Sequence, residues 1–583
     1  MSELKSAELA SQKTLNEMFA AINAAKCFRV EAGAGAGKTY SLVKALQYLI
    51  RNRSYDLNKR SQQIACITYT NVAKDEIRVR TDNHPAIYTE TIHAFCWSLL
   101  SGLQKDLRSL IPELSEKWKE RIDAIGGIKM QRVIYDLGYP NASDSEITLH
   151  HDDVIKLMVK LLDVPKFRNL IQCRFPILFI DEYQDTNIDL AEALKRNLIE
   201  NDAGILVGLF GDHWQRIYGS NACGLIECSS DNLVVIGKGV NFRSYPKIVL
   251  CLNRMRPDLT QQPTTIESVG SVKIFHSNGW QGKRRTDNHW QKDLPPGDAH
   301  NYLESTRSIL EKEGWDFDPK QTKILMLTNN VLADEQDYRN LANCFKDNDD
   351  YLKPNDHYIK FFRDTVEPIC ESFESKQYGA MFKNLDKQAP KLACQSDKMI
   401  WAKDIERLCL SRKAMTFAQV LELLKETQHP RLSPKVEEGE KRFAEYPSLS
   451  PDAKNDKIER FFEKIDKFKS VKYSELINLK KYSDNLSPYS TKHGVKGAEF
   501  ENVLVVCGRG WNHYDWNQML ELWNNPIPTD KLEFFERNRN LFYVACSRPK
   551  MRLSLLFTQE LSPKAMTTLE HLFGKENIYG DPS

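Results

Sequence analysis

The sequence lacks a segment that is long and apolar enough to form a membrane-spanning helix, and residues 1–13 are polar, without the apolar stretch of a signal peptide. It also lacks glycine-, serine- and glutamine-rich tracts, which excludes a long low-complexity region. The two signs of charge are nearly balanced, with 81 Lys and Arg against 79 Asp and Glu and a formal net charge of +2. We therefore expect no membrane partner, and any nucleic-acid contact must come from a local basic groove.

Paired cysteines at metal-site spacing are also missing. The 13 cysteines contain no CxxC pair, and the closest spacing, Cys223 and Cys228, has no second pair to complete a zinc site. We interpret them as reduced, mostly buried thiols, which are typical of a cytoplasmic protein. With 583 residues, of which 41% are hydrophobic, the chain is long enough for several lobes with cores of their own.

A glycine- and alanine-rich turn stands between a strand-like run, residues 27–30, and a helix-like segment, residues 41–50. Backbone N–H groups can surround a phosphate only where no side chain intrudes. The pattern therefore predicts a phosphate loop, in which Lys38 contacts the β- and γ-phosphates of ATP and Thr39 ligates Mg²⁺. A flexible linker is the alternative, but a linker does not require Gly-Lys-Thr at the start of a helix. The loop consists of Ala32, Gly33, Ala34, Gly35, Ala36, Gly37, Lys38 and Thr39.

A second acidic element follows another buried run, in the sequence FPILFIDEYQDTN. Asp181 and Glu182 end a strand-like segment, and the carboxyl ends of strands in an open α/β sheet lie beside the phosphate loop. We predict that Asp181 holds Mg²⁺ and that Glu182 orients and deprotonates the attacking water. Two acids after a strand can instead cap the next helix, but the upstream phosphate loop favours the catalytic interpretation.

The order of motifs resembles the first RecA-like lobe of the UvrD/Rep/PcrA family of superfamily 1 helicases. The matching segments are the phosphate loop, ITYTNVAKDEIRVR (residues 67–80), ETIHAF (90–95), DEYQDT (181–186) and GDHWQRIY (211–218). The resemblance implies that Gln215 senses the γ-phosphate and that Gln12 and Tyr218 contribute to the nucleotide site. It also implies DNA contacts, through phosphate and sugar, from Tyr69, Thr70, Asn71, Thr91 and His93.

One position departs from the family pattern. The family usually carries a base-stacking aromatic residue two positions after the last tyrosine of GDxxQxIY, where this chain has Ser220. Because stacking contributes about 1–3 kcal/mol per base, we expect a weaker hold on single strands, or a substitute in Trp214 or Tyr218.

Two further segments are similar to motifs of the family's second RecA-like lobe. By that resemblance, Arg243 in NFRSYPKIV and Arg548 in RNRNLFYVACSRP would reach the ATP γ-phosphate from across the cleft. Taken alone, either arginine could equally lie on a solvated helix face. The segment YSTKHGVKGAEF resembles TxHxxKGLEF, with Gly494 where serine is usual. By that resemblance Glu499 binds the ribose, and DNA or the ATP cleft is contacted by Thr491, His493, Lys496 and Gly497.

We therefore predict an α/β fold with two RecA-like P-loop lobes, each built on a parallel sheet and each interrupted by a helical insertion subdomain. Leucine, lysine and glutamate at helical spacing indicate these insertions. The predicted division is first lobe 1–96 and 170–235, first insertion 97–169, second lobe 236–330 and 486–583, and second insertion 331–485.

The resemblance implies an ATP- and Mg²⁺-dependent DNA helicase or translocase that moves 3′ to 5′ on single-stranded or partly duplex DNA, in repair or in antiphage defence. A different interpretation is an ATPase that senses DNA or nucleotides and regulates a partner nuclease, as the UvrD-like subunit of a Gabija-type antiphage system would. An RNA helicase is a third, weaker interpretation. Because the motifs extend almost to residue 583, we expect any nuclease to be a separate chain.

Overall fold

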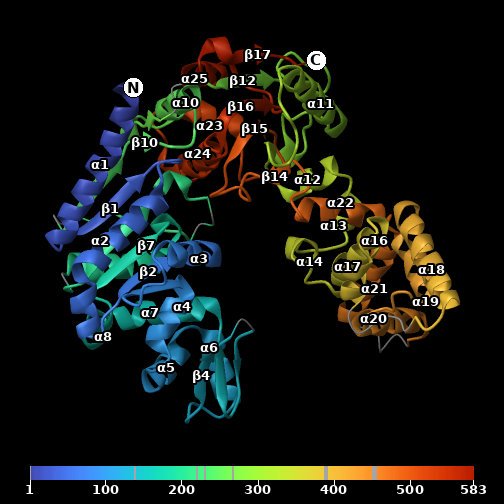
Figure 1. Ribbon diagram of the computed structural model, residues 1–583, viewed down its shortest axis with the longest axis horizontal. Coiled ribbons are helices and arrows are strands. Elements are labelled where there is room, and N and C mark those ends of the chain that lie inside the picture. The colour runs from blue at the N-terminus through green and yellow to red at the C-terminus, as the bar shows by residue number, and fades with distance from the viewer. Residues whose placement is uncertain are drawn as a thin grey trace.

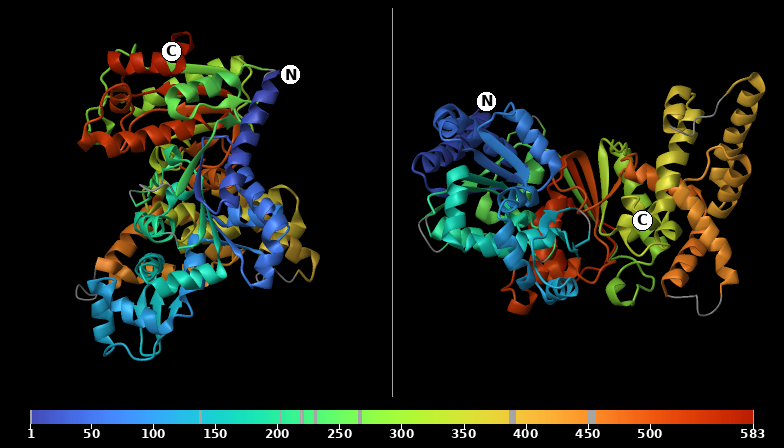
Figure 2. Two further views of the ribbon diagram at one scale, coloured as in Figure 1. Left: turned by 90° about the vertical axis from the view of Figure 1, so that its left-hand side faces the viewer. Right: turned by 90° about the horizontal axis from the view of Figure 1, so that it is seen from below.

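Two α/β lobes are in contact in a computed structural model of the protein, with one subdomain attached to each of them (Figure 1). The structure describes residues 2–136, 139–201, 203–217, 219, 221–228, 232–264, 268–385, 392–449 and 456–582. The second lobe lies between the first lobe and the large helical subdomain (Figure 2). Within these described ranges, no helix has both the length and the apolar character needed to cross a membrane.

The first lobe is built on a six-stranded sheet in the order β3-β2-β7-β8-β1-β9, in which all neighbouring strands are parallel. Side chains of β7 alternate between two cores: Ile177 and Phe179 pack with α1 and α2, and Leu178 and Ile180 pack on the other face. The strands are β1 (Cys27–Ala32), β2 (Ile64–Thr68), β3 (Ile87–Thr91), β7 (Ile177–Asp181), β8 (Leu206–Gly211) and β9 (Leu233–Lys238). The helices are α1 (Ser2–Asn23), α2 (Lys38–Lys59), α3 (Asn71–Arg80), α4 (Ile92–Leu100), α7 (His151–Leu162), α8 (Pro165–Arg174) and α9 (Ile188–Leu194).

The second lobe has a parallel sheet in the order β14-β13-β15-β16-β12-β17. Both of its faces are buried, because Val503 and Val505 of β15 enter one core and Leu504 and Val506 enter another. Its strands are β12 (Ser271–His276), β13 (Thr322–Met326), β14 (Tyr489–Thr491), β15 (Phe500–Val506), β16 (Pro549–Phe557) and β17 (Ile578–Gly580). Its helices are α10 (Pro246–Met255), α11 (Pro296–Lys312), α23 (Trp516–Leu522), α24 (Leu532–Cys546) and α25 (Pro563–Phe573). The predicted fold class, two α/β lobes with parallel sheets, is confirmed.

The first insertion is not purely helical, which corrects the prediction for residues 97–169. Besides α5 (Gln104–Leu110) and α6 (Glu116–Ala124), it contains a small sheet of β4 (Arg132–Tyr135), β5 (Asn141–Ala142) and β6 (Glu146–Leu149). These strands have two to four residues, which is too short for an alternating apolar pattern to be recognised in the sequence.

The second insertion is helical and has its own aromatic core, in which Phe417 packs against Phe362, Phe468 and Tyr473. Its helices are α12 (Asn329–Glu335), α13 (Arg339–Ala342), α14 (Asn348–Leu352), α15 (His357–Phe361), α16 (Glu367–Glu374), α17 (Tyr378–Leu385), α18 (Gln395–Ala414), α19 (Phe417–Thr427), α20 (Pro434–Glu445), α21 (Asp456–Ser470) and α22 (Ser474–Ser483).

The two lobes are joined directly beside the phosphate loop. Strand β9 pairs with β1 as far as Lys238, so the predicted boundary after residue 235 falls inside a strand of the first sheet. The chain then forms β10 (Val240–Asn241), which pairs in parallel with β11 (Gln262–Pro263), before and after α10. Residues 239–245 therefore connect the lobes next to the strand that leads into the phosphate loop.

Candidate nucleotide site between the two lobes

The glycine- and alanine-rich turn connects the end of β1 to the start of α2, as a phosphate loop requires. Gly35 and Gly37 have φ values of 73° and 74°, in the left-handed region that glycine adopts without strain. Helix α2 begins at Lys38, so its free N–H groups and positive dipole end face the loop. The ammonium group of Lys38 lies 3.3 Å from Glu182 Oε1. The predicted anion-binding lysine and the predicted general base are thus in contact.

The phosphate loop is also contacted by residues that come after the first sheet in the sequence, one of them on α24 of the second lobe. The carbonyl oxygen of Ala34 accepts hydrogen bonds from Asn241 Nδ2 at 3.1 Å and Gln261 Nε2 at 3.2 Å. The N–H group of Ala34 donates to the Tyr543 hydroxyl of α24 at 3.3 Å. A Cβ atom at Gly35 would lie 2.6 Å from Asn241 Oδ1 and 2.9 Å from Arg243 Cβ. Glycine is therefore needed at position 35 for the close approach of the second lobe as well as for the turn.

Asp181 and Glu182 lie at the carboxyl end of β7, and their pKa values are shifted in opposite directions. Burial and the neighbouring Glu182 carboxylate raise the pKa of Asp181 to about 7. Burial also acts to raise the pKa of Glu182, but the ammonium groups of Lys38 and Lys496 outweigh it and lower that pKa to about 2. Lys496 belongs to the second lobe and forms an ion pair with Asp185. Glu182 is consequently held as an anion by one lysine from each lobe.

The acidic residues fit a divalent cation. Asp181 Oδ1 is buried, and no hydrogen-bond partner for it is present in the described part of the chain. A buried carboxylate oxygen without a partner lowers the stability of the folded protein unless a cation lies close to it. Together with the Thr39 hydroxyl in the first turn of α2, Asp181 supplies the oxygen ligands that Mg²⁺ prefers.

The raised pKa of Asp181 predicts a pH-dependent response to Mg²⁺. Because the folded-state pKa of about 7 lies above the ordinary value of 3.8, the metal-free protein should lose stability as pH rises from about 4 to about 7. Mg²⁺ competes with the proton, so it should raise the melting temperature more at pH 8 than at pH 6. Thermal unfolding with and without Mg²⁺ measures this difference. The Asp181→Asn variant should show the same Mg²⁺ response at both pH values, and an unchanged pH dependence in this variant would contradict the assignment.

The two predicted arginines lie near the loop, in different environments. Arg243 forms an ion pair with Glu499, Nε to Oε2 3.2 Å, and donates to the Ser547 carbonyl at 3.1 Å. Arg548 is 1% exposed, and its hydrogen bonds go to the carbonyls of Val544 and Ala498 and to the Ser547 hydroxyl. Burial and the charge of Arg243 lower the pKa of Arg548. Since its described acceptors are neutral, Arg548 is a buried cation suited to meet an incoming anion.

Both carboxylate oxygens of Glu499 form ion pairs, Oε2 with Arg243 and Oε1 with Lys550 at 3.1 Å. Its predicted role at the ribose stays a prediction. Gln12 lies exposed on α1 and donates to Asn16 at 2.9 Å, and the described contacts do not bring it to the phosphate loop. Tyr218 and Ser220 lie outside the described residues.

Gln215 is buried and donates to Asp212 Oδ2 at 2.7 Å, directly after β8. Its neighbour Trp214 is only 8% exposed. The Trp214 ring packs against Tyr543, with centroids 5.4 Å apart, and lies under the guanidinium of Arg539 at 3.9 Å. Trp214 is therefore part of the contact between the lobes, and the prediction that it could replace the missing base-stacking residue is wrong.

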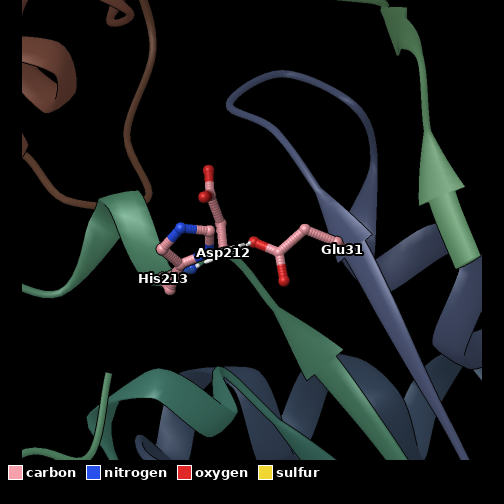
Figure 3. Close-up of side chains that lie close together, drawn as sticks. All are labelled: Glu31, Asp212 and His213. Carbon is pink, nitrogen blue, oxygen red and sulfur yellow. Dashed lines mark hydrogen bonds and ion pairs between the residues drawn. The ribbon is translucent and has the colours of Figure 1, made fainter. Parts of the chain in front are cut away.

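Three side chains beside this segment have the spacing of metal ligands. Figure 3 shows Glu31, Asp212 and His213 converging from β1 and the end of β8. Arg256 already pairs with the two carboxylates, at 3.0 Å from Glu31 Oε1, and His213 lies 2.7 Å from the same oxygen. Although burial acts to raise it, these partners lower the pKa of Glu31 to about 2. We therefore interpret the cluster as an ion-pair network rather than a metal site.

The predicted DNA contacts lie at the ends of strands in both lobes. Tyr69, Thr70 and Asn71 follow β2, but the Thr70 hydroxyl caps α3 by accepting from Ala73 N at 3.1 Å. Thr91 ends β3, and His93 packs on His151 of α7 with ring centroids 4.8 Å apart.

In the second lobe, Thr491 and His493 line a pocket of about 720 Å³. Burial and the adjacent Lys492 lower the pKa of His493 to about 4, so this side chain is neutral near pH 7. Thr491 accepts a hydrogen bond from Gly494 N at 3.0 Å. Gly497 follows on the same loop with φ 84°.

Several residues that contact the predicted site were missed in the sequence. Tyr40 and Phe242, both exposed, flank the buried ammonium of Lys238 at 5.4 Å and 5.7 Å from their ring centroids. Lys238 in turn donates to the Gly37 carbonyl at 3.0 Å. Their positions in the sequence could have identified them, because Tyr40 directly follows Lys38-Thr39 and Phe242 directly precedes Arg243. No local pattern indicated Lys238 or Arg256.

Comparison with known proteins finds two family models in this chain, an AAA domain at residues 16–221 and a UvrD-like helicase C-terminal domain at residues 302–560. The Gabija protein GajB of Bacillus cereus (strain HuB5-5) is 24% identical over 97% of both chains. The ATP-dependent DNA helicase PcrA of Bacillus subtilis is 25% identical over 42% of this chain and 40% of its own length. The helicase Rep of Buchnera aphidicola is 25% identical over 38% of this chain and 41% of its own. The two lobes, their matched motifs and these relatives place the chain in the UvrD-like helicase family.

Proposed function

We propose that this chain is an ATP-dependent DNA helicase or translocase that moves 3′ to 5′ along single-stranded DNA, in DNA repair or antiphage defence. The observation that carries the proposal is the position of Arg243, whose Cβ lies 2.9 Å from where a Cβ of Gly35 would be, beside the phosphate loop. Arg548 reinforces it as a buried cation with neutral hydrogen-bond acceptors. Both support a site in which nucleotide is held between two lobes, so that hydrolysis and lobe movement are coupled.

In this mechanism the triphosphate of ATP displaces Glu182 from Lys38. The released carboxylate then orients and deprotonates the attacking water, while Arg243 and Arg548 stabilise the charge that develops on the γ-phosphate. The Thr39 hydroxyl and the Asp181 carboxylate would hold Mg²⁺, which supplies charge neutralisation to the phosphates. After hydrolysis, Lys38 and Glu182 can pair again as they do at 3.3 Å in the structure.

We place the single strand across the pocket of about 720 Å³, which is lined by both lobes. Arg216 comes from the first lobe, and Thr491, His493 and Trp511 come from the second. Trp511 is 43% exposed and lies with its ring centroid 5.5 Å from that of Tyr514. Since Trp214 is buried, we assign the base-stacking role to Trp511, an exposed aromatic side chain of this pocket.

Replacement of Trp511 by alanine should weaken binding of a single-stranded oligonucleotide. Loss of one base stack, about 1–3 kcal/mol, corresponds to a Kd that rises about 5- to 150-fold. Fluorescence anisotropy with a labelled oligonucleotide measures it. Tyr55→Ala removes an exposed aromatic side chain of α2 that does not line the pocket and serves as the control. Equal affinities of the two variants would argue against the assignment of the DNA path.

The activity is tested by ATP hydrolysis with and without single-stranded DNA and by strand displacement on duplexes that carry a 3′ or a 5′ tail. We expect DNA to stimulate hydrolysis and the 3′-tailed duplex to be unwound. Absence of DNA-stimulated hydrolysis would reject the motor, and preference for the 5′ tail would reject the polarity.

A second candidate is an ATPase subunit that senses DNA or nucleotides and regulates a partner nuclease in an antiviral complex. The observation that favours it is the similarity to the Gabija protein GajB over 97% of both chains, whereas the helicases PcrA and Rep align with less than half. In this case the isolated chain should hydrolyse ATP but displace little strand. Stable assembly with a nuclease encoded nearby, together with altered nuclease activity, would favour this candidate over the motor.

A further inference from the structure

Arg256 joins the two lobes through a buried network centred on Asp212. The side chain of Arg256 is 1% exposed, and that of Asp212 is fully buried. Arg256 contacts Asp212 Oδ1 through Nη1 and Glu31 Oε1 through Nη2, the latter at 3.0 Å. A guanidinium between two carboxylates at this depth is a strong, directional contact, and loss of one partner leaves an uncompensated buried charge.

The two ends of this contact belong to different lobes. Arg256 directly follows α10, and that helix packs into the core of the second sheet through Leu252 and Met255. Asp212 follows β8, and Glu31 lies on β1, both in the first sheet. Arg256 is therefore fixed to the second lobe and reaches into the first.

Asp212 also holds two residues that are proposed to act in hydrolysis. Its Oδ2 accepts from Gln215 Nε2 at 2.7 Å. Its backbone N–H donates to Gln184 Oε1 at 3.0 Å, and Gln184 Nε2 donates to Glu182 Oε2. Gln184 is completely buried and so has little freedom to move. Arg256 thus holds the side chain of Asp212, and hydrogen bonds run from the backbone of Asp212 through Gln184 to Glu182.

We propose that Arg256 is a positioning residue for ATP hydrolysis, which holds Gln215 and Glu182 in place through Asp212 when the lobes are together. The inference rests on the proposed function, because it assigns a role in that reaction. Arg256 differs from Arg548, since its charge is already matched by two buried carboxylates, and by the exposed Asp258 as well, so that it has no need of a phosphate partner. It therefore acts on the residues of the site rather than on the nucleotide.

A residue that only stabilises the fold would change the melting temperature without a specific effect on turnover. A positioning residue should instead lower kcat with little change in KM, because misplaced catalytic groups affect the transition state more than ground-state binding. We expect Arg256→Gln to lower kcat for ATP about 10- to 100-fold and to leave KM within about threefold. Arg256→Lys keeps the charge but cannot pair with both carboxylates in the same geometry, so its kcat should be intermediate.

The second measurement is hydrogen–deuterium exchange of the nucleotide-free full chain. The amide of Asp212 reports directly, because it donates to Gln184. In Arg256→Gln, exchange should rise in peptides that cover residues 181–186 and 211–217. Arg254→Gln removes a neighbouring positive charge of α10 and should leave both peptides unchanged. If Arg256→Gln does not fold, the double variant Glu31→Gln/Arg256→Gln removes opposite charges together and replaces it in both measurements.

Unchanged exchange in both peptides, or a kcat within twofold of the wild type, would overturn the inference. If the wild-type chain does not hydrolyse ATP, the proposed function fails, but the exchange measurement still decides whether Arg256 holds the Asp212 network. Increased exchange confined to residues 211–217 would also overturn it, because Glu182 would then not be held through Gln184.

Discussion

Glu182→Gln should abolish most ATP hydrolysis while the protein still binds nucleotide. Removal of a general base lowers turnover about 10²- to 10⁴-fold. The change also removes the negative partner that lies 3.3 Å from Lys38. Since Lys38 is then free to meet the triphosphate, binding should be as tight as in the wild type or tighter. Steady-state hydrolysis and binding of a fluorescent ATP analogue measure the two effects separately.

Lys38→Ala is the matched comparison at the other end of this ion pair. It should lose hydrolysis and nucleotide binding together, because the phosphate-contacting ammonium group is removed. It also leaves Asp181 and Glu182 as two neighbouring carboxylates without that cation. Circular dichroism checks that both variants fold. Undiminished turnover in either variant would rule out the assigned site.

Arg548→Gln should show the second large effect, a loss of turnover without a loss of stability. An arginine that neutralises the charge of the transferring phosphoryl group contributes about 10³- to 10⁵-fold to kcat. In the structure this guanidinium is buried and hydrogen-bonded only to neutral groups among the described residues. Removal of an unmatched buried charge relieves a desolvation cost, so the melting temperature should be unchanged or higher. Hydrolysis assays and thermal unfolding measure the two quantities.

Arg552→Gln is the control for this variant. Arg552 lies on β16, a few residues from Arg548, and donates to the Gly314 carbonyl at the surface. Its replacement should leave turnover close to that of the wild type. A parallel fall of turnover and melting temperature in Arg548→Gln would indicate a structural role and would remove the main support for coupling between the lobes.

The phosphate loop could be predicted because its requirements are local. Small residues, two positive φ values and a helix that starts at Lys38 are all properties of consecutive residues. The buried strands before Asp181 and Asp212 were recognisable for the same reason, since both faces of a parallel sheet are covered and the strands are apolar throughout. Arg243 and Arg548 were identified by resemblance to family motifs, not by the spacing of their charges.

The first insertion and Trp214 show where local patterns fail. The strands β4, β5 and β6 are stabilised by each other across the chain, and two to four residues carry too little periodicity to be recognised. Trp214 was a candidate for base stacking because of its type and position. Its burial is determined by Tyr543 and Arg539 on α24, more than 300 residues away.

By itself, the sequence determined the two parallel-sheet lobes, the phosphate loop and the acidic pair, because each depends on neighbouring residues along the chain. Only the tertiary structure decided which charges are matched: Arg256 is paired with Glu31 and Asp212, and Glu182 lies beside Lys38 and Lys496. Arg548 has only neutral acceptors among the described residues. The physical reason is that the cost of a buried charge depends on the groups within a few ångströms of it, and folding brings these groups together from distant parts of the chain.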